Sequence, residues 1–198
     1  MMTDALDPHA VALSGRRLPG DLAIWIFILA EMAAFAVFFA VYAFARARNV
    51  ELFDAAQLTL DRRAGMINTL LLVTGGWFAA GAVHAARAER LAAAGRGLWL
   101  ALACGAGFLA VKVLEYADKF AAGLSMSTNT FYLFYFSLTF FHFLHVVLGM
   151  AILGILLGRL RQGAYGRHDV RGLETGTAYW HMVDLLWIVL FPLVYVMR

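Results

Sequence analysis

Five long apolar stretches dominate the chain, each separated from the next by a short polar segment. A helix rises 1.5 Å per residue, so about 20 residues cross the roughly 30 Å hydrocarbon core of a bilayer. The alternating pattern of a barrel strand is absent, which leaves helices to satisfy the backbone in lipid. We therefore predict an all-α, integral membrane bundle of five transmembrane helices. The predicted spans are residues 21–45, 65–86, 97–117, 129–158 and 175–197.

The segment 1–20 mixes charged residues and prolines and has no apolar core, so it is predicted to be an N-terminal tail. The first span is longer than the apolar core of a signal peptide and has Glu31 near its centre, so we expect no cleaved signal. Internal repeats and low-complexity linkers are absent from the sequence. The pattern therefore predicts one membrane domain over residues 1–198.

Composition supports a membrane protein. Of the 198 residues, 63% are hydrophobic and 15% charged, whereas soluble domains average about 45–50% and about 25%. These values exclude a disordered chain, a nucleic-acid-binding module and an ordinary soluble enzyme. The single cysteine, Cys104, excludes a disulfide or a thiolate metal cluster within the chain.

Basic residues in the connecting segments predict the orientation. The side with the N-terminus and the second and fourth loops carries nine basic residues, and the other side carries six. Because cytoplasmic loops are enriched in Lys and Arg, we predict a cytoplasmic N-terminus and an external C-terminus. The nine are Arg16, Arg17, Arg87, Arg90, Arg96, Arg159, Arg161, Arg167 and Arg171; the six are Arg46, Arg48, Arg62, Arg63, Lys119 and Arg198. The basic fourth loop, which also contains His168, is expected to anchor to anionic lipid.

Two other features of the spans have local interpretations. Trp25, Trp99 and Trp180 lie near predicted span ends, where tryptophan is enriched at the membrane interface. Pro192 is expected to bend the last helix.

Apart from Asp21 at a span end, eight charged or histidine side chains lie within the predicted spans, where a charge at the centre of a helix costs roughly 2.5–3.5 kcal/mol. They are Glu31, His84, Lys112, Glu115, His142, His145, His181 and Asp184. Three pairs are three residues apart and so share a helix face: Lys112 with Glu115, His142 with His145, and His181 with Asp184. We expect Lys112 and Glu115 to form a buried ion pair. Residue counting along the helices indicates that Glu31, His145, His181 and Asp184 lie at similar depth and could meet in one buried polar layer.

Three interpretations of this layer stay open on the residues alone. Buried polar side chains can pair with one another and set helix register. They can also line a cleft that handles lipid or protons. Histidines three residues apart, with a carboxylate, can bind iron, manganese or zinc, but the Glu-x-x-His pairs of a di-iron bundle are absent from this sequence.

In their order along the chain, these residues resemble the subunit III family of haem-copper oxidases. Residues 179–187, YWHMVDLLW, are similar to that family's YWHFVDxxW signature, which Glu174 precedes. Residues 142–149, HFLHVVLG, are similar to its HGLHVxxG motif, although Phe143 replaces the glycine. The remaining matches to the family are Glu115-Tyr116, residues 66–69 with His84, and residues 28–31.

The five-span length resembles the short forms of this family, which are the ubiquinol-oxidase subunit III and the NorE protein associated with nitric oxide reductase. Three segments are more similar to NorE: residues 112–116, 128–132 and 68–72. Whether the complex reduces nitric oxide or oxygen stays open at this point.

The resemblance implies a non-catalytic accessory subunit in the bacterial inner membrane. Such a subunit has no cofactor of its own, docks beside a catalytic subunit that holds haem and possibly copper or non-haem iron, and has no nucleic-acid partner. It binds phospholipid in a cleft and supports assembly and proton-linked turnover. The candidate polar or lipid-cleft residues are Glu31, His84, His142, His145, His181 and Asp184. A small proton- or ion-handling transporter that works as a homo-oligomer is the alternative.

Overall fold

The computed structural model describes residues 22–165 and 170–197, and five of its helices are long and apolar enough to cross a membrane. The predicted all-α bundle with five candidate transmembrane helices is confirmed. The helices are α2 (Leu22–Arg48), α4 (Arg62–Arg87), α5 (Leu91–Ala121), α6 (Thr130–Arg161) and α7 (Arg171–Phe191). A short helix, α3 (Val50–Gln57), follows α2, and a π-helix, η1 (Pro192–Val196), follows α7.

The observed helices extend past the apolar stretches. Helix α5 begins at Leu91 and ends at Ala121, beyond both ends of the predicted span 97–117. Hydropathy marks only the part of a helix that suits hydrocarbon, whereas the backbone hydrogen bonds continue into the polar interface. Helix α3 was not predicted, because eight residues are too few to stand out as a span. Its buried Phe53, Ala56 and Gln57 show that it nevertheless packs on the bundle.

Local capping explains where several helices begin and end. The Asp61 side chain accepts hydrogen bonds from two backbone amides at the start of α4, and the Asn129 side chain accepts one at the start of α6. Gly123 and Gly163 follow α5 and α6 with φ of +75°, a conformation that glycine adopts without steric penalty.

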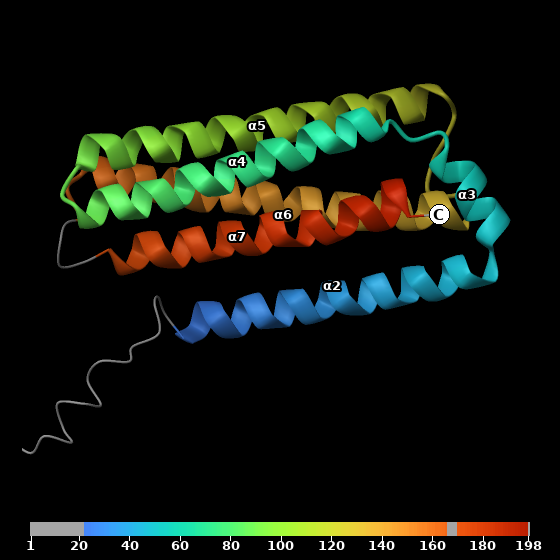
Figure 1. The fold of residues 1–198 in the computed structure, drawn as a ribbon, viewed down its shortest axis with the longest axis horizontal. Coiled ribbons are helices and arrows are strands. Elements are labelled where there is room, and N and C mark those ends of the chain that lie inside the picture. The colour runs from blue at the N-terminus through green and yellow to red at the C-terminus, as the bar shows by residue number, and fades with distance from the viewer. Residues whose placement is uncertain (1–21, 166–169, 198) are drawn as a thin grey trace, which may run out of the picture.

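Helices α4, α5, α6 and α7 form a four-helix arrangement in which α4 packs on α5 and α7, and α6 packs on the same two helices. Helix α2 lies along the outside of this group against α7 and α6 (Figure 1). Its buried residues, Ile28, Phe35 and Tyr42, are spaced by seven, so one narrow stripe faces the bundle. Helix α3 covers the end of the bundle at which η1 and the C-terminus lie (Figure 1).

Trp180 lies at the centre of the core rather than at an interface. The prediction that it belongs to an interfacial belt is wrong, because its side chain is fully buried. Glycines on three neighbouring helices leave room for the indole: a Cβ at Gly105 would lie 2.8 Å from the ring, one at Gly149 3.0 Å and one at Gly75 3.4 Å. Trp99, in contrast, is 53% exposed, as an interfacial tryptophan should be.

Candidate functional site

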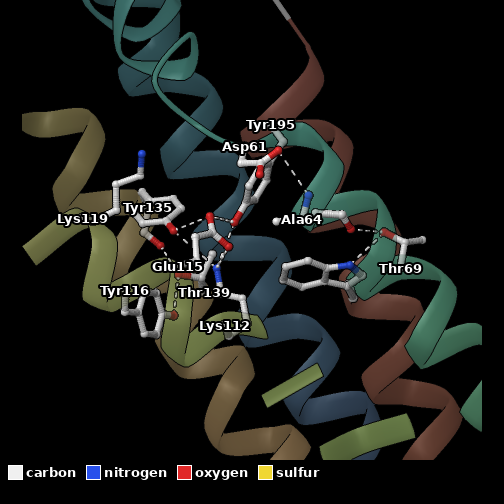
Figure 2. Close-up of polar contacts among 12 residues, drawn as sticks. Asp61, Ala64, Thr69, Lys112, Glu115, Tyr116, Lys119, Tyr135, Thr139 and Tyr195 are labelled. Atoms are coloured by element: carbon white, nitrogen blue, oxygen red, sulfur yellow. Dashed lines mark hydrogen bonds and ion pairs between the residues drawn. The ribbon is translucent and has the colours of Figure 1, made fainter. Parts of the chain in front are cut away.

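A cluster of buried polar groups lies between α5, α6 and η1, near the end of the bundle that α3 covers. The Lys112 Nζ donates to Glu115 Oε2 at 3.1 Å and to the Tyr195 hydroxyl at 2.9 Å. The hydroxyls of Tyr135 and Tyr195 both donate to Glu115 Oε1 at 2.7 Å (Figure 2). We call these four residues the Lys112–Glu115 cluster.

Aromatic rings surround the Lys112 ammonium in this cluster. Ring centroids of Tyr116, Tyr135, Tyr195 and Trp187 lie 4.7–5.7 Å from its nitrogen, within the range of cation–π attraction. Lys112 is completely buried and Glu115 is 6% exposed. A buried ion pair is tolerated only when further hydrogen bonds satisfy both charges, and the two tyrosine hydroxyls supply them here.

Residues far away in the sequence hold Tyr195 in the cluster. The Gln57 Nε2 of α3 donates to the backbone oxygen of Val194 at 3.0 Å and lies 3.3 Å from the Tyr42 hydroxyl. Arg46 is paired with Asp54 at 2.9 Å and also donates to the backbone oxygen of Met197. The expected bend at Pro192 takes the form of the π-helix η1, and these contacts fix its position.

A second polar contact joins α2 to α6. The His145 Nε2 lies 3.1 Å from Glu31 Oε2, and its Nδ1 lies 2.7 Å from the backbone oxygen of Phe141. Since a carbonyl oxygen only accepts, Nδ1 carries hydrogen and donates to Phe141. The contact of Nε2 with Glu31 then needs one more proton, held either on Nε2, which donates to the carboxylate, or on the Glu31 carboxyl group, which donates to Nε2. The Phe35 ring packs edge-on against His145, 5.3 Å between centroids, and shields this contact.

His181 and Asp184 form a separate pair on α7. The His181 Nδ1 lies 3.1 Å from Asp184 Oδ2, and the carboxylate packs closely on α4, where a Cβ at Gly76 would lie 2.3 Å from Oδ2. The His181 side chain is 45% exposed. The expected single buried layer is therefore divided, and no hydrogen bond among the described residues joins this pair to Glu31 and His145. Residue counting gives height along a helix but not the direction in which a side chain points.

His142 and His84 lie in contrasting surroundings. His142 is fully buried among the rings of Trp187, Phe108 and Phe35, with centroids 5.2, 5.6 and 6.5 Å away. Neither of its ring nitrogens has a hydrogen-bond partner among the described residues. His84 is exposed. Within residues 22–165 and 170–197, no three His, Cys, Asp or Glu side chains converge as metal ligands would.

His84 and His181 line a groove between α2, α4 and α7, with a volume of about 480 Å³. Its walls are largely apolar, and Trp25, Ile28 and Met32 contribute from α2. Arg87 and Glu174 lie at the helix ends of the groove and form an ion pair at 2.7 Å. We call it the α2–α4–α7 groove. Of the basic fourth loop, Arg167 and His168 lie outside the described residues.

Sequence reasoning missed the residues that complete the Lys112–Glu115 cluster. Tyr135 and Tyr195 were indistinguishable from ordinary core aromatics in apolar runs, and Gln57 lay in a segment expected to be a loop. A buried tyrosine hydroxyl needs a hydrogen-bond partner, so the tyrosines within the apolar spans were the available signal.

Comparisons with known proteins identify the family. The family model for cytochrome c oxidase subunit III matches residues 19–198, which is nearly the whole chain. The chain belongs to the cytochrome c oxidase subunit III family.

Two relatives of similar length carry different oxidase names. The chain is 30% identical to cytochrome c oxidase subunit 3 of Thermostichus vulcanus, over 89% of this chain and 86% of the relative. It is also 30% identical to quinol oxidase subunit 3 of Bacillus subtilis, over 89% of this chain and 86% of the relative.

A third relative combines two subunits in one chain. The haem-copper oxidase subunit I+III of Aeropyrum pernix is 31% identical over 87% of this chain, and the match spans 22% of that relative. The predicted resemblance to subunit III is therefore confirmed for the family as a whole. This family includes subunits of cytochrome c oxidases and of quinol oxidases.

Proposed function

We propose that this subunit III is an accessory subunit that docks beside the catalytic haem-containing subunit I of a haem-copper oxidase-type complex. The observation that carries the proposal is the family match over residues 19–198, together with the Aeropyrum pernix relative that joins subunits I and III in one chain. Covalent joining of two subunits is most easily understood if they are neighbours in the complex. Haem and any copper or non-haem iron would then belong to the partner.

The polar contacts within the bundle support a structural role for this chain. The Lys112–Glu115 cluster and the contact of Glu31 with His145 each join different helices, and their donors and acceptors are paired within the chain. Closed contacts of this kind set the register between helices in lipid. A rigid bundle of this form is suited to bracing a neighbouring subunit and supporting its assembly.

The α2–α4–α7 groove is the proposed phospholipid site of this subunit. Its apolar walls suit acyl chains, and His84, Arg87 and His181 supply polar groups where a headgroup would lie. Helix α2 contacts the bundle through one narrow stripe, so a lipid in the groove would add to the surface that holds it.

Within the family, we assign the chain to the NorE type associated with nitric oxide reductase, on the strength of the Lys-x-x-Glu-Tyr segment at 112–116. We also propose that it lies in the bacterial inner membrane with its N-terminus in the cytoplasm. Among the described residues, the end with the α2 N-terminus has six arginines, and the α3 end has five basic residues. This asymmetry supports the proposed orientation.

Purification of the tagged chain from its native membranes in mild detergent tests the docking proposal. We expect a haem-containing membrane subunit to co-purify, with haem absent from the chain after that subunit is removed. Stoichiometric haem or metal in the isolated chain would overturn the accessory role. Ion flux in vesicles that hold this chain alone, abolished by Glu31→Gln, would favour the transporter alternative.

The same preparation tests the NorE assignment. We expect the co-purified complex to consume nitric oxide anaerobically with a suitable electron donor. Oxygen consumption without nitric oxide consumption would contradict the assignment and place the chain with the terminal oxidases, while the accessory role would stand.

A further inference from the structure

A second groove lies between α5 and α6, at the end of the bundle where the arginines collect. It has a volume of about 480 Å³ and is formed by the first turns of α5 and the last turns of α6. Its lining includes the polar side chains of Arg96, Trp99 and Arg161 and the apolar side chains of Leu157 and Leu160. It shares none of its lining residues with the α2–α4–α7 groove.

The two arginines of this groove are available for a ligand. Neither Arg96 nor Arg161 forms an ion pair with any residue in the described ranges, and both are exposed. The two described carboxylates at this end are Glu89 and Glu174; neither lines the groove, and Glu174 is paired with Arg87. The Arg161 guanidinium lies over the Trp99 ring at 5.6 Å from its centroid. A cation–π contact of this kind uses none of the guanidinium N–H donors, so they stay available to a ligand.

The α6 residues that line the groove lie at different depths along the helix axis. Arg161 lies at the end of the helix, and Leu157 lies one turn, about 6 Å, deeper along the axis. Trp99 is half-exposed, as expected for a tryptophan at the level of the lipid headgroups. Arg161 therefore lies nearer the membrane surface than Leu157, and the groove combines cationic and apolar groups at the level of the lipid headgroups.

We propose that this groove binds an anionic phospholipid, with the phosphate held by Arg96 and Arg161 and an acyl chain against Leu157 and Leu160. Charge complementarity selects the ligand: two guanidiniums that have no ion pair within residues 22–165 and 170–197 favour a lipid with net negative charge over a zwitterionic one. A free phosphate shares the headgroup chemistry but has no group to occupy the apolar side. This site is separate from the proposed accessory function and can be tested without a partner subunit.

Native mass spectrometry of the full-length chain in detergent tests the proposal, with phosphatidylglycerol, phosphatidylcholine and inorganic phosphate as separate probes. We expect one tightly bound phosphatidylglycerol that the double variant R96Q/R161Q binds about 30-fold more weakly, if each arginine contributes about a factor of five. Arg159→Gln is the matched control, because Arg159 is exposed on the same end of α6 but does not line the groove. This control should bind phosphatidylglycerol like the parent chain.

Equal binding of phosphatidylglycerol and phosphatidylcholine by the parent chain would overturn the proposal. So would displacement of the lipid by inorganic phosphate, or an unchanged affinity in R96Q/R161Q. A second measurement keeps both arginines and so does not depend on the folding of the double variant. The fluorescence of Trp99 is the part of the tryptophan signal that is lost in Trp99→Phe. Brominated phosphatidylglycerol should quench this fluorescence, and brominated phosphatidylcholine should not. Equal quenching by the two brominated lipids contradicts selective binding in this groove.

Discussion

The Tyr195 hydroxyl donates a 2.7 Å hydrogen bond to Glu115 Oε1, although 80 residues separate the two along the chain. Through this bond, the π-helix η1 at the C-terminal end of α7 becomes part of the buried polar core of α5 and α6. The bond depends on α3, since the Gln57 side chain holds the backbone of η1 beside it. The last turn of the chain and a short helix near its beginning therefore stabilise one buried charge pair together.

Replacing one residue of the Lys112–Glu115 pair should lower the free energy of unfolding by more than replacing both. Lys112→Met leaves the Glu115 carboxylate buried without its cation, and we expect a loss of about 3–5 kcal/mol in the free energy of unfolding. The double variant K112M/E115Q should recover much of this loss, because no unpaired charge remains. Unfolding of the detergent-solubilised chain, followed by circular dichroism, measures both. Additive effects of the two substitutions would contradict the buried pair.

Gln57→Ala should destabilise the chain by releasing η1. It removes the donor to the buried Val194 carbonyl, and an unsatisfied buried acceptor costs about 1–3 kcal/mol. Gln162→Ala is the control, since Gln162 is exposed after α6 and a surface change of this kind stays within about 0.5 kcal/mol. The same unfolding assay compares the two, and equal stabilities would show that Gln57 does not hold the C-terminal turn.

Gly105→Ala should destabilise the bundle because the added methyl group would lie 2.8 Å from the Trp180 ring and 3.0 Å from Met150. Overpacking of this kind costs about 1–3 kcal/mol. Gly81→Ala tests the opposite case in α4, where a Cβ would have nothing within 4 Å. There the gain in helix propensity should stabilise the chain by about 0.5–1 kcal/mol. Thermal unfolding of both variants should show shifts of opposite sign.

Glu31→Ala should loosen α2, because it removes the side chain whose hydrogen bond with His145 joins this helix to α6. We expect faster amide hydrogen exchange in α2 and a lower yield of assembled complex, with unchanged turnover per haem in the complex that does form. Glu51→Ala, at an exposed acid on α3, serves as the control. Altered turnover per haem at normal assembly would instead indicate a proton-related role for Glu31.

Asp184→Asn should likewise reduce assembly and leave turnover per haem unchanged. The Asp184 carboxylate packs between His181 and the α4 backbone at Gly76, so the substitution weakens the pairing with His181 that positions this side chain against α4. The ratio of haem to this chain in purified complex measures assembly. A normal ratio with a changed dependence of turnover on pH would contradict a purely structural role.

Spacing along the helices identified which polar residues could pair locally but not which would pair across helices. Lys112 and Glu115 were predicted as partners because residues three apart share a helix face, and they lie 3.1 Å apart in the structure. The tyrosines that complete their hydrogen bonds come from α6 and η1, and nothing in the local pattern of either segment indicates that contact. Similarly, Trp180 was predicted to be interfacial from its position along the chain alone. The sequence does not show that glycines from three other helices lie against its ring.

By itself, the sequence determined that this chain is a five-helix membrane protein, because a helix of about 20 apolar residues is set by bilayer thickness and backbone hydrogen bonding alone. It also determined the family motifs, which are contiguous. The tertiary structure decided which side of each helix faces inward, and so it separated His181 from Glu31 and brought Tyr195 to Glu115. Those relationships depend on the rotation and packing of whole helices, which follow from many contacts between segments distant along the chain.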